Sequence, residues 1–206
     1  MAEREFLEEN ARRRTTAAVR AVEVTTSMEL VVAARSRAGW HAGTSAALGL
    51  VFALSTLAVM WWSPTPYDVA TMPLDALVAF VLGASLSATV PFVRRALTPR
   101  AFLRSAAERA ARRAFASLGV EKTRERTGCL VHVALFERTV VFLPDVGLPR
   151  ELVDVGFRDA RLALEESVKR LDFAAFLGAL AALGPPAQRH LPRRPDDENE
   201  LCDDVA

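Results

Sequence analysis

The sequence predicts an α/β fold in which a small sheet is flanked by helices and a two-helix transmembrane hairpin is inserted after the first strand. Two observations lead to this prediction. Residues 38–93 contain no Lys or Arg, although the chain of 206 residues has 26 of them. The residues on both sides of that stretch show the apolar patterns of amphipathic helices and short strands. Neither flanking piece is large enough to fold well alone, so we expect them to form one domain together.

The elements of this domain follow from local patterns. An imperfect apolar stripe predicts a helix over Glu3–Val24, and the valine-rich run Met28–Ser36 predicts a strand. After the hairpin, Thr98 offers an N-cap, Pro99 the first position and Gly119 the C-cap of a second helix. The later elements are strands Leu130–Phe136 and Thr139–Leu143, joined by a tight turn at Glu137-Arg138, and helices Pro149–Leu171 and Asp172–Leu183, the last stopped by Gly184-Pro185-Pro186.

The expected organisation therefore has four parts. They are the first part of the α/β domain (residues 1–41), the hairpin (44–93), the second part of the domain (94–184) and an acidic, proline-containing tail (185–206). We expect the last part of the tail, Arg193–Ala206, to be largely unstructured.

The apolar stretch contains two segments that match the thickness of a bilayer. A hydrocarbon core of about 30 Å needs about 20 apolar residues of helix, and Ser45–Trp62 and Pro73–Val93 approach or meet that length. The two prolines of "SPTPYD" predict a turn between them. The alternative is a pair of buried helices in a soluble core, but such helices are usually shorter and have a polar face. Aromatic residues near the turn, Trp61, Trp62 and Tyr67, are typical of a membrane interface.

The basic residues predict the orientation of this hairpin. Arg35 and Arg37 precede it, several arginines follow from Arg94 on, and the connecting loop has none. Because cytoplasmic loops are enriched in Lys and Arg, we expect a two-pass protein of the cytoplasmic (inner) membrane with both termini in the cytoplasm. The lipid bilayer is then its first partner.

Charge and cysteine usage exclude several classes of protein. The net charge is only +1, and outside the hairpin acidic and basic residues are mixed, so we expect no nucleic-acid partner. Cys129 and Cys202 lie far apart without a CxxC spacing, so neither a disulfide framework nor a zinc site is indicated. The first residues lack an apolar core, so a cleaved signal peptide is not expected.

Three segments resemble the TPM-domain family. "AVEVTTSMELVV" (21–32) resembles its helix end, threonine-containing turn and strand, and "NEL" (199–201) resembles a terminal motif of bacterial membrane-bound members. This chain departs from those members at Cys202, where proline is usual, and at Phe157, where they have tryptophan. "TRERTGCLVHVALFERTVVFLPDVGL" (123–148) resembles the central signature, which is carried here by Thr127, Gly128, Glu137, Arg138, Asp145 and Gly147.

The resemblance implies an α/β sandwich and leaves the function open. Some members of this family are acid phosphatases or bind divalent cations, whereas others are accessory proteins of membrane complexes. Whether this chain is an enzyme is therefore left open by the resemblance. A Ca²⁺ or Mg²⁺ cofactor is compatible with it.

The residues themselves offer one candidate metal site and no catalytic one. Asp145, with Asp154 and Asp159 beyond it, could supply carboxylates to Ca²⁺ or Mg²⁺. The alternative is that Asp145 is a turn residue before Gly147, since hard cations need several oxygens and this loop offers one carboxylate. Glu137-Arg138 is interpreted as an exposed turn.

No residue is predicted to be catalytic. His132 in an apolar strand is expected to be a packed residue and not a general base; His41 and His190 lie near the bilayer and in the tail. The chain has no phosphate-binding loop, GxSxG or paired metal-ligand spacing.

Two hypotheses follow. The first is a membrane protein whose cytoplasmic TPM-like domain binds a partner or serves a membrane protein complex as an accessory module. The alternative is a membrane-tethered, divalent-cation-dependent acid phosphatase, which depends on family analogy alone.

Overall fold

The computed structural model describes residues 5–39, 42–64, 67–194 and 201. The chain forms two compact units: the α/β unit, made of residues up to Gly39 and from Leu103 on, and the hairpin unit, Trp40–Phe102. Several residues named above lie outside the described ones: Glu3 at the start of the first predicted helix, His41, part of the predicted turn, and residues 195–200 and 202–206 of the tail, which include Asn199, Glu200 and Cys202.

A three-stranded mixed sheet lies at the centre of the α/β unit. Its strands are β1 (Glu29–Arg35), β2 (Gly128–Ala134) and β3 (Thr139–Pro144), in the order β1-β2-β3. β1 is parallel to β2, with Glu29 opposite Gly128, and β2 is antiparallel to β3. The strand before the hairpin thus pairs with the strands after it, which confirms that the hairpin is inserted within one α/β domain.

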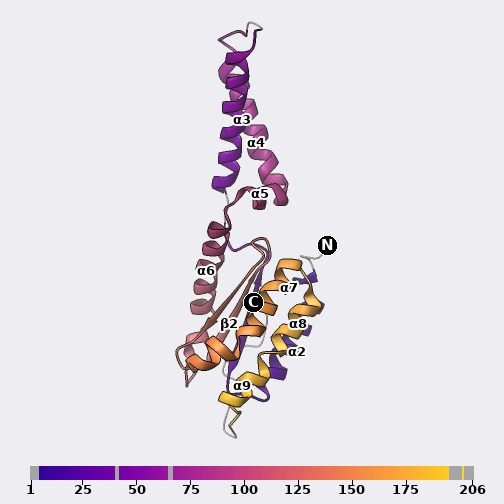
Figure 1. Cartoon of the computed structure of the whole chain (residues 1–206), viewed down its shortest axis with the longest axis vertical. Coiled ribbons are helices and arrows are strands. Elements are labelled where there is room, and N and C mark those ends of the chain that lie inside the picture. Colours follow the sequence, from indigo (N-terminus) through magenta and orange to yellow (C-terminus); the bar gives the residue numbers. More distant parts are fainter. Residues whose placement is uncertain (1–4, 40–41, 65–66, 195–200, 202–206) are drawn as a thin grey trace. The chain divides into compact units, whose positions relative to one another are not determined.

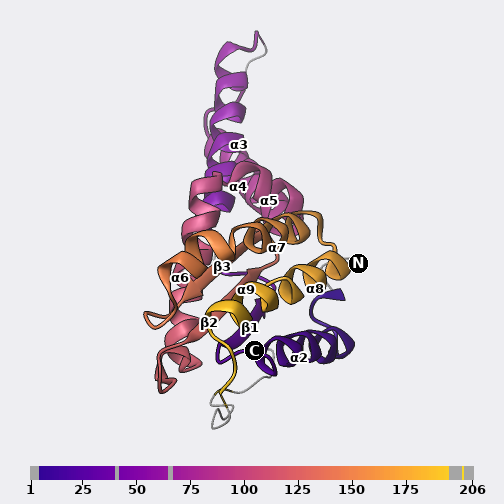
Figure 2. The same ribbon diagram turned by 60° about the horizontal axis from the view of Figure 1, so that its bottom comes forward.

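Helices cover both faces of the sheet (Figure 1). One face carries α2 (Glu9–Glu23), α7 (Arg158–Arg170), α8 (Phe173–Ala181) and α9 (Gly184–His190), and α2, α7 and α8 lie side by side in Figure 2. The other face carries α6 (Arg100–Ser117), whose residues from Leu103 on belong to this unit. As predicted from its continuous apolar sequence, β2 is buried on both faces.

The two faces of β2 belong to different clusters of core residues. Cys129, Val131 and Val133 pack in the large cluster with the side chains of α2, α7 and α8. Leu130 and Ala134 pack on the side of α6, where Ala107 and Ala111 are fully buried. Alanine at these positions leaves no long side chain between the helix and the strands. Each large side chain fully buried in the main cluster contributes about 1.5–3 kcal/mol.

The helix predicted over Pro149–Leu171 is divided in two. A π-helical turn, η2, covers Leu152–Gly156, and α7 begins after it at Arg158. The amide of Phe157 donates to the carbonyl of Leu152 at 2.8 Å, which inserts one extra residue into the turn. The insertion lets Leu152 and Phe157 both be fully buried, where a regular helix would place them on different faces.

The helix before Gly184-Pro185-Pro186 ends as predicted, but a further helix that the sequence did not predict follows it. α8 ends at Ala181, and these three residues form the first turn of α9. Proline lacks an amide hydrogen and is therefore tolerated in the first turn of a helix, where that hydrogen has no partner. Ala187 of α9 is fully buried, and Thr26 and Pro192 form a β-bridge. The structured part of the chain thus extends beyond the predicted boundary at residue 185.

The hairpin unit contains α3 (Ala42–Trp62), α4 (Met72–Thr89) and the short α5 (Pro91–Leu97). Two helical segments, Gly43–Trp62 and Met72–Thr89, are long and apolar enough to cross a membrane, and only 6% and 17% of their residues are buried. The second segment ends earlier than predicted because Pro91 starts α5.

Small residues line the contact between α3 and α4. Ser45 and Gly49 on α3, and Gly83 and Ser87 on α4, are each four positions apart. A Cβ atom on Gly49 would lie 2.7 Å from the carbonyl oxygen of Phe80, and the Ser45 hydroxyl donates to that of Ser87 at 3.3 Å. This spacing is typical of membrane helices whose backbones approach closely.

Arg94 closes the end of α4. Its Nε and Nη2 donate to the carbonyls of Ser87 and Ala88 at 3.1 and 3.0 Å. These carbonyls belong to the last turn of the helix, where no amide is available to them.

Candidate functional site

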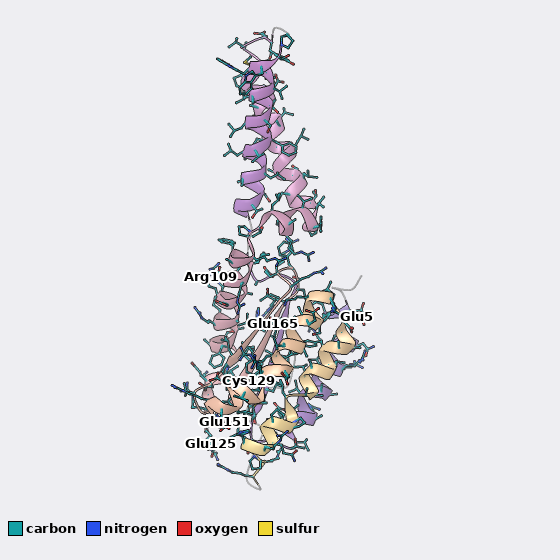
Figure 3. The ribbon with its side chains drawn as sticks, in the orientation of Figure 1. Glu5, Arg109, Glu125, Cys129, Glu151 and Glu165 are labelled. Atoms are coloured by element: carbon teal, nitrogen blue, oxygen red, sulfur yellow. The ribbon has the colours of Figure 1, made fainter. Side chains whose placement is uncertain are left out.

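The candidate metal residue, Asp145, lies where β3 ends and β2 begins. Its amide donates to the carbonyl of Gly128 at 2.8 Å, and the amide of Gly147 donates to the carbonyl of Arg126 at 2.9 Å. These bonds extend the antiparallel pairing of β2 and β3 beyond the strands and hold the loop after β3 against the segment before β2. Figure 3 labels Glu125 and Glu151 at this end of the sheet.

Both glycines of the signature are required by close backbone contacts. A Cβ atom on Gly128 would lie 2.3 Å from the carbonyl oxygen of Val120, and one on Gly147 would lie 2.1 Å from the carbonyl oxygen of Glu125. Real Cβ contacts are never this short, and backbone atoms cannot rotate away as a side chain can. Any larger residue would therefore push Gly128 away from Val120, or Gly147 away from Glu125.

Asp145 forms a two-point ion pair with Arg126. Arg126 Nε donates to Oδ2 at 2.6 Å and Nη2 to Oδ1 at 2.9 Å, and the amide of Val146 also donates to Oδ1, at 2.8 Å. The Asp145 side chain is 3% exposed, whereas that of Arg126 is 47% exposed. The hydrogen bonds from Arg126 hold the pKa of Asp145 below its usual value, although burial acts in the opposite direction. Asp145 is thus an ionised anchor for the loop.

This arrangement does not fit a Ca²⁺ or Mg²⁺ site. Such cations need about six oxygen ligands, whereas both oxygens of Asp145 face a guanidinium group that a cation would have to displace. Asp154 and Asp159 are exposed. In residues 5–39, 42–64, 67–194 and 201, no three His, Cys, Asp or Glu side chains are grouped so that they could hold a metal ion. Cation binding at Asp145 stays an untested prediction, and it would require the carboxylate to leave Arg126.

Glu137 and Arg138, at the opposite end of the sheet, are not the exposed turn that the sequence predicts. Glu137 is 4% exposed. Both of its carboxylate oxygens accept from the amide of Ala38, at 3.1 Å each, and Arg138 Nη1 donates to the carbonyl of Lys169 at 2.8 Å. The turn is buried because the chain leaving β1 folds over it: the amide of Leu135 donates to the carbonyl of Arg35.

The signature residues therefore divide between the two ends of the sheet and do not form a single site. Thr127 joins the Asp145 end by donating its hydroxyl to the carbonyl of Ser27 at 2.9 Å. Each contact ties together segments that lie far apart in the sequence. Sequence reasoning missed Arg126, whose only signal was its position next to Thr127. It also missed Glu23, whose Oε1 accepts from the amide of Leu30 at 2.9 Å.

Of the histidines, His132 and His190 are described by the structure, and neither contributes to the contacts at the two ends of the sheet. His132 is 1% exposed in β2, and its Nδ1 has no hydrogen-bond partner among the described residues. Burial, and to a smaller extent the charge of Arg35, lowers the pKa of His132 to about 4. The imidazole is therefore neutral near pH 7. His190 is exposed in α9, with Nδ1 at 3.0 Å from the carbonyl of Pro186.

Comparison with known proteins supports the fold. No family model matches the chain, and no curated protein matches its sequence. Among solved structures, the BA42 protein from the psychrophilic bacterium Bizionia argentinensis matches with a TM-score of 0.58 at 17% sequence identity, over 98% of this chain and 95% of BA42. At this identity the match bears on fold alone. The chain thus has an α/β fold similar to that of BA42, a TPM-like domain protein, with two long apolar helices after the first strand.

Proposed function

We propose that this chain is a two-pass protein of the cytoplasmic membrane whose α/β unit lies in the cytoplasm and binds a partner, as an accessory module of a membrane protein complex. The observation that carries the proposal is the apolar surface of α3 and α4. Leu54, Val59 and Leu82 are 56%, 64% and 61% exposed, and similar side chains surround both helices. Two adjacent helices that are apolar all round match a lipid environment and not a water-exposed surface.

The charges around the hairpin support the orientation. Arg94, Arg95 and Arg100 follow α4 closely, whereas the loop between α3 and α4 contains no Lys or Arg. Trp61 and Trp62, at the end of α3 next to that loop, are 83% and 80% exposed, as side chains at the bilayer surface would be. Together these features favour a loop outside the cytoplasm and termini inside it.

The α/β unit supports a binding role through what its signature residues do. Glu137, Arg126 and Asp145 hold loops at the two ends of the sheet by hydrogen bonds that are buried at Glu137 and partly buried at Arg126 and Asp145. Side chains engaged in this way make the surface rigid. A rigid surface lowers the entropy cost of binding a partner.

Membrane location and orientation are tested together by cysteine labelling. In cells that produce a Ser63→Cys variant, an impermeant maleimide should label the loop from outside, whereas Cys202 should be labelled only after the membrane is opened. Cys129 is fully buried and does not interfere. Two results would refute this part. One is release of the chain from the membrane fraction by alkaline carbonate, and the other is labelling of Cys202 from outside while position 63 is labelled only after the membrane is opened.

The binding role is tested by purification in detergent after crosslinking in cells. The intact chain should repeatedly retain the same membrane protein. A matched control replaces residues 44–93 by an unrelated two-span hairpin and should retain that partner, because the α/β unit is unchanged. Loss of the partner in the control, or no partner in repeated trials, contradicts the proposal. Hydrolysis of p-nitrophenyl phosphate that requires Mg²⁺ or Ca²⁺ and is lost in Asp145→Asn would instead favour the phosphatase hypothesis.

A further inference from the structure

The strand β3 has an open edge. It pairs with β2 on one side, and no strand covers its other side in the part of the chain that the structure describes. The bond from the amide of Asp145 to the carbonyl of Gly128 sets the alternation of the ladder. Val141 and Leu143 consequently direct their backbone groups toward β2, and Val140 and Phe142 direct theirs outward. No strand pairs with these outward amides and carbonyls in the part of the chain that the structure describes, so they can accept another extended chain.

A groove lies along this edge. Its floor is formed by residues 140–143, one wall by Arg104, Glu108 and Arg112 of α6, and the other by Arg161, Leu164 and Glu165 of α7; its volume is about 260 Å³. Figure 3 labels a residue on each of these two helices, Arg109 and Glu165, on opposite sides of the strands. An extended chain laid on β3 would place alternate side chains against the two walls.

The walls carry an excess of positive charge. The carboxylates are already paired: Glu108 with Arg104 at 3.2 Å, and Glu165 with Lys169 at 3.7 Å. Arg161 lies over the ring of Phe142, 5.4 Å from its centroid, and has no carboxylate partner among the described residues. Arg112 is exposed and likewise has none among them. Each wall therefore has one arginine without a carboxylate partner among the described residues, although Arg161 Nη1 also donates to the carbonyl of Val153 at 3.4 Å.

The charges of Arg112 and Arg161 indicate which kind of chain can bind in the groove. A second copy of the chain, pairing β3 with β3, would bring its own Arg112 and Arg161 against the same two residues, and like charges in contact disfavour that pairing. A segment with acidic side chains on both of its faces would pair with both arginines. The other edge of the sheet is less available, since Glu23 already accepts from the outward amide of Leu30.

We propose that the groove along β3 binds an acidic, extended segment of a partner protein, which adds to the sheet as a fourth strand. Backbone hydrogen bonds to Val140 and Phe142 would hold the segment, and its acidic residues would select this edge through Arg112 and Arg161. The inference rests on the proposed partner-binding function and assigns the surface and the chemistry of the partner.

The first experiment uses a fluorescent synthetic octapeptide of valine and glutamate, with glutamates on both faces, and the full chain in detergent micelles. Fluorescence anisotropy should show saturable binding, at least tenfold weaker for Arg112→Glu. The matched control Arg113→Glu changes the same charge on a neighbouring exposed position of α6 outside the groove and should bind within twofold of the unaltered chain.

A second peptide separates strand addition from simple charge attraction. N-methylation of every peptide bond keeps the charges but removes the backbone donors, so binding should be lost. Equal binding of both peptides, equal effects of the two substitutions, or no binding at millimolar protein would each overturn the proposal.

Other occupants give different results. Self-association of the chain that is lost in Arg112→Glu would assign the groove to a second copy. Binding that requires removal of residues 195–206 would assign it to the chain's own acidic tail. Either result would overturn the proposal. If a crosslinked partner is still retained by Arg112→Glu, the groove assignment fails while the binding function stands; failure to retain any partner by the unaltered chain refutes the function itself.

Discussion

Replacing Asp145 by asparagine should loosen the α/β unit without unfolding it. Asparagine has nearly the same size and keeps one acceptor oxygen, but it loses the charge and the second hydrogen bond to Arg126. A hydrogen bond to a charged group is worth about 1.5–3 kcal/mol. The Arg126 side chain is 47% exposed, so water can replace part of the lost contact. We therefore expect a loss of stability at the low end of this range, about 1.5 kcal/mol. This corresponds to an increase of about tenfold in the population of the opened unit.

The buried thiol of Cys129 provides the assay. Cys129 is fully buried in β2, and it can react with a disulfide reagent only when the unit opens. In a Cys202→Ser background, the labelling rate of Cys129 should rise about tenfold in Asp145→Asn, as expected for that change in free energy. Asp154→Asn, which changes an exposed aspartate nearby in sequence, is the control and should leave the rate unchanged.

The pH dependence of the effect has a definite sign. Arg126 lowers the pKa of Asp145 below its ordinary 3.8 in the folded protein, so the stabilisation is fully present above pH 3.8 and is lost as the pH falls through the folded pKa. The ratio of the two labelling rates should therefore be constant between pH 7 and 5 and approach one in stronger acid. Equal rates at pH 7 would refute the assignment of Asp145 as an ionised anchor.

Three further predictions test other parts of the chain. His132→Leu should reduce the fall in stability between pH 7 and 5, measured by thermal unfolding with circular dichroism. The folded pKa of about 4 lies below the unfolded 6.5, so protonation of the unfolded state costs about 2 kcal/mol over that range. Glu137→Ala should speed hydrogen exchange of the Ala38 amide at least tenfold, because that amide loses its buried acceptor. Gly83→Leu should destabilise the hairpin unit by about 1–3 kcal/mol, since a Cβ atom would lie 2.9 Å from the carbonyl of Leu48; tryptophan fluorescence reports it, because all three tryptophans lie in residues 40–62.

The sequence predicted the sheet and the hairpin because the signals for both are local. The apolar runs Leu130–Phe136 and Ser45–Trp62 predict a strand and a helix from their own residues alone. The pairing of β1 with β2 then followed from size, because neither flanking piece could bury a core by itself.

The details of the two sheet ends could not be predicted in the same way. Charged residues in a hairpin turn are usually solvated, and nothing near Glu137 indicates that the amide of Ala38, 99 positions earlier, would require its carboxylate. Arg126 likewise meets Asp145 only once the strands are paired. The motif Gly184-Pro185-Pro186 was ambiguous for a different reason: it is compatible with both the end of one helix and the start of the next.

The parallel pairing of β1 with β2 has a consequence for the folding of this protein during its synthesis. During synthesis on the ribosome, β1 emerges about a hundred residues before β2. The edge of β1 therefore stays unpaired while the apolar helices are synthesised. Under the proposed membrane location, insertion of those helices into a bilayer would precede closure of the sheet. Under the proposed membrane location, a nascent chain that failed to insert would expose both an unpaired strand and two apolar helices to chaperones, and we expect it to be degraded before it accumulates.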